Sequence, residues 1–285
     1  MSNSWHQQKQ SIGLLAKLSR MKCLKFKLET PYLVNFRKPY STITILSYSF
    51  PPYTTVRGLL ANALGLGDLW TARDNYNIGL EDLKISLKPL NVPERFQDMV
   101  LMKKLKPPAD SKKRKDLMKK LEDNDFNLDV LDEKEKELYE RMRIPQNTSA
   151  PFVKEFITPV ACIIYVLGEI KKLNELKEAL DDPKRPLYIG GSDDFVIISD
   201  IEGPIDTVEI ESDEVDSIVM INEEVQPLDK KRILGRVPYR FDVVNAKKRD
   251  YSRKDAIVAS PLPNERLKLT KMIKCFKIGT ENVAF

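Results

Sequence analysis

Cationic and aromatic side chains alternate in one stretch near the start of the chain. Guanidinium and ammonium groups bind phosphate oxygens, and aromatic rings stack on unpaired bases, so this combination is typical of a site for single-stranded nucleic acid. A cation in the first turn of a helix also adds its charge to free backbone amides, which favours an anion there. The candidate binding residues of this stretch are Arg37, Lys38, Tyr40, Tyr53 and Arg57.

The same residue types also have a structural interpretation. Tyr48, Phe50 and Tyr53 could pack a sheet against a helix, as large aromatic side chains commonly do. Arg57 could form an internal ion pair instead of meeting a phosphate. Because Arg57 begins an otherwise apolar helix, we expect the phosphate contact.

The net charge of +5 conceals strongly charged blocks. Residues 1–60 hold nine Lys or Arg and one acid, and residues 101–120 hold nine against two. Residues 121–140 hold nine acids against two bases, and residues 192–224 hold twelve acids and no base. A polyanion would meet the basic blocks, although such runs are equally typical of solvated helix faces. The second basic block adds the candidates Lys103, Lys104, Lys112, Lys113, Arg114 and Lys115.

Two adjacent glycines, Gly190 and Gly191, precede an apolar run. Because glycine has no Cβ and adopts positive φ, this pair could let an RNA backbone approach closely. A plain tight turn is the equal alternative. The following Asp193 and Asp194 could hold magnesium, but neighbouring residues on a strand point to opposite faces, so we predict a solvated loop and no metal site.

The chain contains few histidine and cysteine residues that could carry catalysis or bind a metal. His6 is the single histidine, so neither a histidine general base nor a histidine metal ligand is expected. The three cysteines are widely spaced, which argues against a zinc site or a disulfide framework and favours a reducing cytosol. The longest apolar run is about half of the roughly 20 residues that a membrane-spanning helix needs. We therefore predict a cytoplasmic protein with no cofactor, no bound metal and no membrane contact.

The spacing of apolar residues predicts the elements that position these groups. In chain order we expect a strand over 21–30, a helix over 56–64, a strand over 83–90, and a strand over 152–167 with a bulge or an edge at Pro159. A helix over 170–180 follows, and residues 186–201 are expected to form a Gly-Gly turn and then a strand. Pro51 and Pro52 prevent an earlier start of the first helix, Thr54 or Thr55 can cap it, and Gly65 ends it. The resulting order is that of the α+β ferredoxin-like (RRM-like) βαββαβ fold.

The remaining segments suggest the domain organisation. We expect a flexible extension over 1–20, and the ferredoxin-like domain over 21–204 with a long thumb-like insertion at about 99–150. Within the insertion, we expect a basic arm from Lys103 to Lys120 that is mobile in the free chain and ordered on RNA, because its prolines oppose regular structure. The acidic segment that follows has helical spacing and could instead fold back and neutralise the arm within the chain. Residues 205–285 contain short strand candidates only, and we expect a smaller β-rich C-terminal region.

Two stretches resemble one known family. FRKP followed by SYSFPPYTTVRGLLANALG, within residues 36–65, is similar to the N-terminal signature of the fifth CRISPR-associated (Cas) subunit family. PLYIGGSDDFV, at residues 186–196, is similar to the glycine turn that precedes the last ferredoxin-like strand of that family. The two stretches stand in the expected order, with a long insertion between them.

The resemblance implies a function. Members of this RAMP-type family are RNA-binding subunits of type I Cascade surveillance complexes. They hold the 5′ handle of the CRISPR RNA (crRNA) and contact the backbone and large subunits, with target DNA met only indirectly. For the basic insertion, the resemblance implies a thumb that folds over the junction of handle and spacer.

Two other functions stay open from the sequence. One branch of the family cleaves precursor crRNA without a metal, using side chains such as Tyr, His and Lys, so a metal-independent endoribonuclease is the main alternative. With one histidine we expect no catalytic residue here. A protein-interaction module without RNA contact is the third interpretation, and the acidic stretch 192–224 is the expected face for a protein neighbour.

Overall fold

A computed structural model describes residues 21–39, 44–66, 80, 82–105, 111–143, 147–191, 194–245 and 250–285. The chain forms two compact units. Unit 1 takes in residues up to 40, residues 46–96 and residues 155–285, and unit 2 takes in residues 41–45 and 97–154. The extension over 1–20 and Tyr40 lie outside the described residues. Residues 205–285, expected as a smaller β-rich C-terminal region, lie in unit 1.

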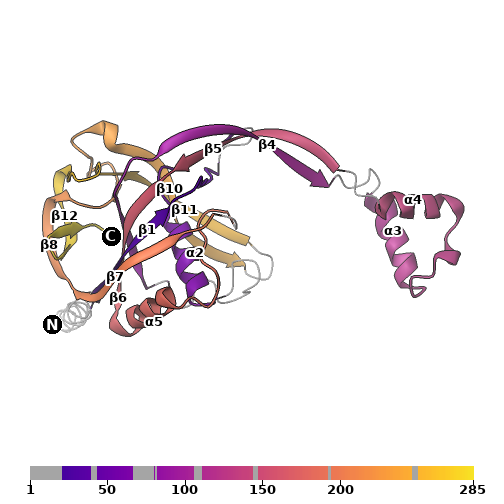
Figure 1. Ribbon diagram of the computed structural model, residues 1–285, viewed down its shortest axis with the longest axis horizontal. Coiled ribbons are helices and arrows are strands. Elements are labelled where there is room, and N and C mark those ends of the chain that lie inside the picture. Colours follow the sequence, from indigo (N-terminus) through magenta and orange to yellow (C-terminus); the bar gives the residue numbers. More distant parts are fainter. Residues whose placement is uncertain are drawn as a thin grey trace, which may run out of the picture. The chain divides into compact units, whose positions relative to one another are not determined.

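Unit 1 is built on a four-stranded antiparallel sheet with the order β3-β6-β1-β7 (Figure 1). Its strands are β1 (Met21–Thr30), β3 (Lys84–Pro89), β6 (Val160–Glu169) and β7 (Ile197–Asp206). The central pair of β1 and β6 is in register from Met21 opposite Glu169 onward. Alternate residues of β1 point to one face, and Phe26 and Leu28 are fully buried there.

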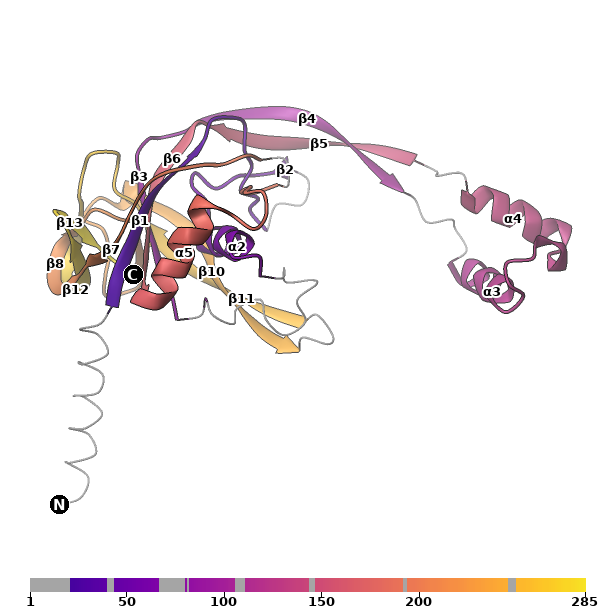
Figure 2. The ribbon, with the colours of Figure 1, turned by 60° about the horizontal axis from the view of Figure 1, so that its bottom comes forward.

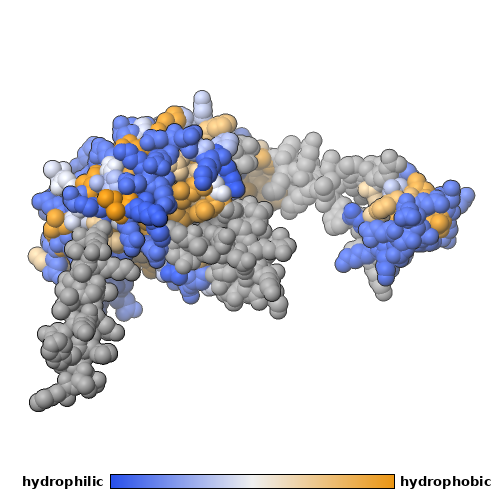
Figure 3. All heavy atoms as spheres, turned by 90° about the horizontal axis from the view of Figure 1, so that it is seen from below, coloured by the Kyte–Doolittle hydropathy of each residue, from blue (hydrophilic) through white to orange (hydrophobic). Residues whose placement is uncertain are grey.

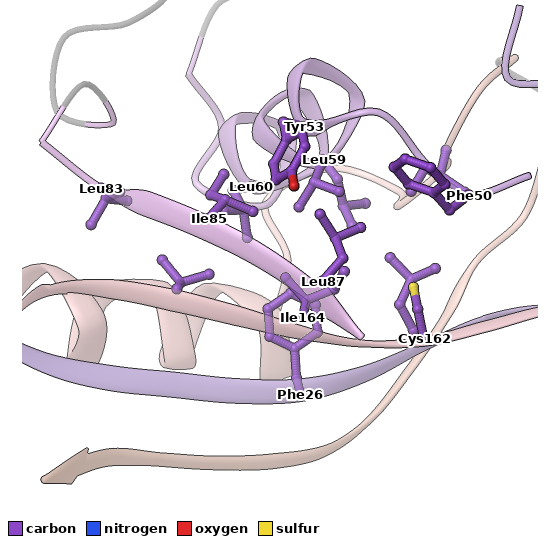
Figure 4. Packing of buried hydrophobic residues seen from close by; sticks show 14 of the residues in the cluster. Phe26, Phe50, Tyr53, Leu59, Leu60, Leu83, Ile85, Leu87, Cys162 and Ile164 are labelled. Carbon is purple, nitrogen blue, oxygen red and sulfur yellow. The ribbon is translucent and has the colours of Figure 1, made fainter. Parts of the chain in front are cut away.

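Two helices cover that face. α2 (Tyr53–Ala63) and α5 (Ile170–Asp181) follow β1 and β6 in the chain and lie side by side (Figure 2). Leu59 and Leu60 of α2 are buried at helical spacing and pack toward the strands (Figure 4). The apolar residues whose spacing predicts these helices are therefore the ones that pack on the sheet.

The ends of α2 test two local predictions. Gly65 adopts the left-handed conformation, with φ +69°, and the Leu66 amide donates to the Ala61 carbonyl at 2.9 Å. This is the Schellman arrangement that glycine favours, and it confirms the predicted stop. The predicted threonine cap is wrong, because the helix begins at Tyr53 and its N-cap is Pro52, which has no hydroxyl.

The end of the chain covers the opposite face of the sheet. Strands β8 (Val208–Val215), β12 (Leu267–Ile278) and β13 (Glu281–Val283) form a second sheet with the order β13-β12-β8. Phe276, Ile278 and Val283 pack in one cluster with Cys23 and Tyr165 of the first sheet. Figure 2 shows these C-terminal strands on the side of β1 away from α2 and α5.

A third sheet completes unit 1. The strands β9 (Val219–Ile221), β10 (Ile233–Asn245) and β11 (Asp250–Ala259) pair in the order β10-β11-β9, and the 3-10 turn η2 (Lys230–Arg232) precedes β10. β8, β9 and β12 coincide with the short strand candidates of the sequence, which lie around Val208, over 217–221 and over 267–276, whereas β10, β11 and β13 were not predicted. Register shifts near Gly235 and Pro238 interrupt the alternation by which a strand is recognised.

Unit 2 is the insertion. Most of β4 (Glu94–Leu105) and β5 (Asn147–Thr158) belongs to it, together with β2 (Thr44–Ile45), in a sheet with the order β2-β5-β4. Between β4 and β5 lie α3 (Ser111–Glu122), the 3-10 turn η1 (Leu128–Val130) and α4 (Glu133–Arg143). Leu117, Leu121 and Leu131 form a small core between the helices. Figure 3 shows one face of this helical pair, at its right, where most side chains are hydrophilic.

The insertion and its return strand differ in part from the predictions. The basic arm, expected to lack regular structure, is helical from Ser111 because Leu117 and Leu121 pack against the segment that follows. The acidic segment also neutralises it in part, since Lys120 Nζ lies 2.6 Å from a carboxylate oxygen of Glu135. The strand expected over 152–167, with a bulge or an edge at Pro159, is divided at that proline into β5 and β6.

Candidate nucleic-acid interface

Arg37 stands on a short ladder just beyond β1. Its backbone pairs with Ser47, the Lys38 amide donates to the Leu46 carbonyl at 2.8 Å, and the Tyr48 amide donates to the Phe36 carbonyl at 2.9 Å. We call residues 36–38 and 46–48 the Arg37 ladder. Arg37 is exposed, and among the described residues it forms no salt bridge.

The rest of the Arg37 ladder turns inward. Phe36 is buried, and Lys38 Nζ lies 5.6 Å from the centroid of the Tyr48 ring, a cation–π contact. Tyr48 is only 5% exposed, so the structural interpretation holds for this ring. Lys38 is half-buried, which leaves Arg37 as the more accessible cation of the pair.

A buried carboxylate fixes the ladder from within unit 1. Glu155 accepts a hydrogen bond from the Ser47 amide at 2.7 Å, and its backbone carbonyl accepts one from Asn35 Nδ2 at 2.6 Å. Arg95 Nη1 lies 2.9 Å from the Glu155 carboxylate and compensates its charge. Arg95 also donates to the Ser49 hydroxyl at 2.6 Å. The backbone that carries Arg37 is therefore held on both sides.

The glycine pair lies next to this ladder. A Cβ added to Gly190 would lie 3.2 Å from both the Asn35 carbonyl oxygen and Val34 Cγ2, and 2.7 Å from an oxygen of Asp194. The Gly191 amide donates to the same Asp194 oxygen at 2.6 Å. The space next to the glycines thus holds a carboxylate, and the structure favours the plain tight turn over close approach of an RNA backbone. Asp193, the other carboxylate considered for magnesium, lies outside the described residues.

Two predicted contacts are corrected by burial. Tyr53 is 4% exposed and lies in the core between α2 and the sheet (Figure 4), so its ring offers no surface to a base. Burial raises the pKa of its phenol. Arg57 is half-buried, and its guanidinium donates to the carbonyls of Leu80 and Leu83, the latter at 3.2 Å. It therefore anchors the segment before β3, in place of the expected phosphate.

The lysines of the insertion belong to unit 2, whereas the Arg37 ladder belongs to unit 1. Lys103 and Lys104 lie on β4, and Lys112 lies in the first turn of α3. Lys113, Arg114 and Lys115 follow on α3 and are exposed. Lys113, Arg114 and Lys115 therefore form an exposed cationic surface on α3.

The C-terminal strands cover the face of the four-stranded sheet opposite the helices. Glu281 of β13 accepts hydrogen bonds from Lys88 Nζ at 2.7 Å and Tyr165 Oη at 2.8 Å, and Lys25 Nζ lies 3.3 Å away. Burial opposes the charge of Glu281, but the hydrogen bonds from Lys88 and Tyr165 hold its pKa below the usual value. Two lysines of the sheet are thus neutralised within the chain.

The acidic stretch 192–224 is neutralised in part within the chain, and its expected role as a face for a protein neighbour stays a prediction. Because β8 pairs with β12, acids of one strand meet bases of the other. Its pairs include Lys274 with Glu209 at 3.3 Å, Lys268 with Glu214 at 3.1 Å, and Arg266 with Asp216 at 3.3 Å.

Two exposed aromatic residues beside the glycine turn were missed by the sequence analysis. Tyr188 and Phe195 flank the turn and pair with each other in an isolated bridge. The signal was the alternation of apolar residues, which places Leu187, Ile189 and Val196 inward and these two rings outward.

Among the residues that the structure describes, no group of three or more His, Cys, Asp or Glu side chains is arranged to hold a metal ion. No helix within the described ranges is long and apolar enough to span a membrane.

Comparison with known proteins identifies the family. The family model for CRISPR-associated protein Cas5 matches residues 23–256. No curated protein matches the sequence. A chain of a CRISPR RNA-guided surveillance complex is similar in structure, with a TM-score of 0.46, 10% identity, and coverage of 90% of this chain and 92% of that chain. A CRISPR protein from Archaeoglobus fulgidus gives a TM-score of 0.46, 14% identity, and coverage of 92% and 98%. The family match spans most of the chain and confirms the resemblance of its two motifs: the protein belongs to the Cas5 family of CRISPR-associated proteins.

Proposed function

We propose that this Cas5 protein is a non-catalytic RNA-binding subunit of a type I CRISPR effector complex, Cascade, and that it holds the 5′ handle of the crRNA at the Arg37 ladder. The observation that carries the proposal is the exposed Arg37 on a backbone fixed by Glu155. A cation on a fixed backbone loses little conformational freedom when it binds a phosphate. The order β3-β6-β1-β7 with α2 and α5 is, in this proposal, the ferredoxin-like arrangement of the family.

The covered sheet supports the choice of the ladder. In an RRM, aromatic side chains on the open sheet face stack on bases. Here Phe276 and Ile278 pack on that face, and Glu281 neutralises its lysines. RNA is therefore directed away from the sheet surface and toward the ladder at the end of β1.

The proposal assigns no catalytic step. Burial raises the pKa of both Tyr53 and Tyr165, so neither phenol supplies a base near neutral pH. The proposed protein partners are the backbone and large subunits of the complex in the cytoplasm, as the family resemblance implies, with target DNA reached only indirectly.

Fluorescence anisotropy with a single-stranded RNA of about ten nucleotides, measured over a range of salt concentrations, tests the proposal. Each neutralised phosphate contributes about −0.7 to the slope of log K against log salt. Arg37→Glu should weaken binding and make the slope less steep. Arg236→Glu, at an exposed arginine of β10, is the matched control and should leave both unchanged.

Two results would overturn the proposal. Affinity that does not respond to salt would remove the phosphate contact. Cut precursor crRNA after incubation with a metal chelator would establish the endoribonuclease alternative instead of the non-catalytic role.

A further inference from the structure

Two aromatic rings in water flank the glycine turn of unit 1. Tyr188 is 43% exposed and Phe195 is 66% exposed. The residues beside them, Leu187, Ile189 and Val196, pack on the core. This alternation gives the short hairpin one buried face and one open face. Large apolar side chains gathered on an open face indicate a surface that meets a partner.

The two rings stand opposite each other on the same face. Tyr188 and Phe195 form an antiparallel bridge, and the Ile189 amide donates to the Asp194 carbonyl at 2.9 Å. That hydrogen bond lies one residue further into the turn. The aromatic pair is therefore of the type whose side chains approach most closely, with Cβ atoms about 4.5–5.5 Å apart.

The backbone under the rings is fixed. The Asp194 carboxylate accepts the Gly191 amide at 2.6 Å, and the Asp194 amide donates to the Gly191 carbonyl at 3.2 Å. On its other side the turn lies against Asn35, which Glu155 holds. Rings on such a support lose little freedom when a ligand stacks on them.

We propose that Tyr188 and Phe195 form a stacking platform for unpaired bases of the RNA, an inference that rests on the proposed function. The chemistry of the neighbouring groups selects this occupant. The turn lies against Asn35, two residues before the exposed cation Arg37, and a nucleotide offers both an aromatic base and a phosphate. An apolar protein surface would suit the two rings but would offer no anion to Arg37.

A binding experiment with two RNA probes tests the platform. The first probe is a mixed-sequence single-stranded RNA of about ten nucleotides, and the second has the same backbone with abasic ribose at every position. Tyr188→Ala and Phe195→Ala should each weaken binding of the intact RNA about 5- to 150-fold, the range for loss of one stacked base. Both variants should bind the abasic RNA as the unaltered protein does.

Further variants separate stacking from other effects. Phe195→Leu keeps an apolar side chain but removes the ring, so it should resemble Phe195→Ala. Tyr188→Phe keeps the ring and should bind normally. Phe126→Ala removes an aromatic side chain of similar exposure, 55%, in unit 2 and is the matched control, expected to bind the intact RNA normally.

The outcomes distinguish the two proposals. Equal affinity of the unaltered protein for intact and abasic RNA overturns the platform alone, because phosphate binding persists. Variants that bind intact RNA normally but fail to assemble with protein subunits also overturn it, in favour of a protein docking surface. Absence of salt-dependent binding to both probes overturns the proposed function together with the platform.

Discussion

Replacement of Arg57 by alanine should lower stability and leave RNA affinity unchanged. Its guanidinium donates to the carbonyls of Leu80 and Leu83, two buried residues of the main core that precede β3. In Arg57→Ala these carbonyls lose their donor while the chain around them stays packed. The variant therefore tests whether this cation serves the fold or the ligand.

The magnitude follows from the two hydrogen bonds. A hydrogen bond to a charged group contributes about 1.5–3 kcal/mol. One of the two is long, at 3.2 Å, and the side chain is partly exposed, so we expect a loss of about 2 kcal/mol in total. For a unit of this size that corresponds to a fall in melting temperature of roughly 4–8 °C.

Thermal unfolding and RNA anisotropy on the same preparation provide the assay. Arg57→Lys keeps the charge but supplies one compact donor group, so it should recover only part of the stability. A variant with an unchanged melting temperature and RNA binding weaker by about 1–3 kcal/mol would refute the reasoning, because that result belongs to a charge-assisted phosphate contact.

Three other predictions concern groups of unit 1. Glu281→Gln should destabilise the protein at neutral pH and flatten its acid unfolding curve. The pKa of Glu281 is lowered on folding, so its contribution is complete above the ordinary value of 4.5 and is lost as pH falls through the folded pKa. Gly190→Ala should cost more stability than Gly235→Ala, measured by urea unfolding. Both glycines have φ near +95°, but only at Gly190 would the new Cβ meet Asp194, whereas Gly235 faces open space. A thiol reagent at neutral pH should leave the native protein unlabelled and label it once unfolded, because the thiols are buried and their pKa values are raised by burial at Cys23, Cys162 and Cys275.

Local patterns predicted the elements well where one residue type decides the structure. Alternation placed β1 at its observed bounds, and Gly65 ended α2 because only a residue that tolerates positive φ fits there. The outward turn of Tyr188 and Phe195 was equally encoded in alternation. Alternation gives the direction of these side chains but not their function, and the functional interpretation rested on the glycines between them.

Burial and charge pairing could not be predicted from neighbours in the sequence. A tyrosine can serve in a core or on a binding surface. For Tyr53, only the position of the sheet under α2 decides between the two. The acids of β8 lie about 60 residues from the bases of β12 and meet them only through strand pairing, for example Glu209 with Lys274 at 3.3 Å. A count of charges along the chain cannot contain that information.

The location of a cation on the fold decides whether it can serve RNA. Lys25 and Lys88 lie on the sheet face that an RRM would offer to bases, yet Glu281 lies within 3.3 Å of both and the C-terminal strands cover them. Releasing them for RNA would leave the half-buried Glu281 carboxylate without its counter-charges, which is costly. Arg37 forms no salt bridge among the described residues, and its backbone is already fixed by Glu155. The same positive charge is therefore structural on the sheet and available to a ligand at the ladder, beside the aromatic pair that the glycine turn presents.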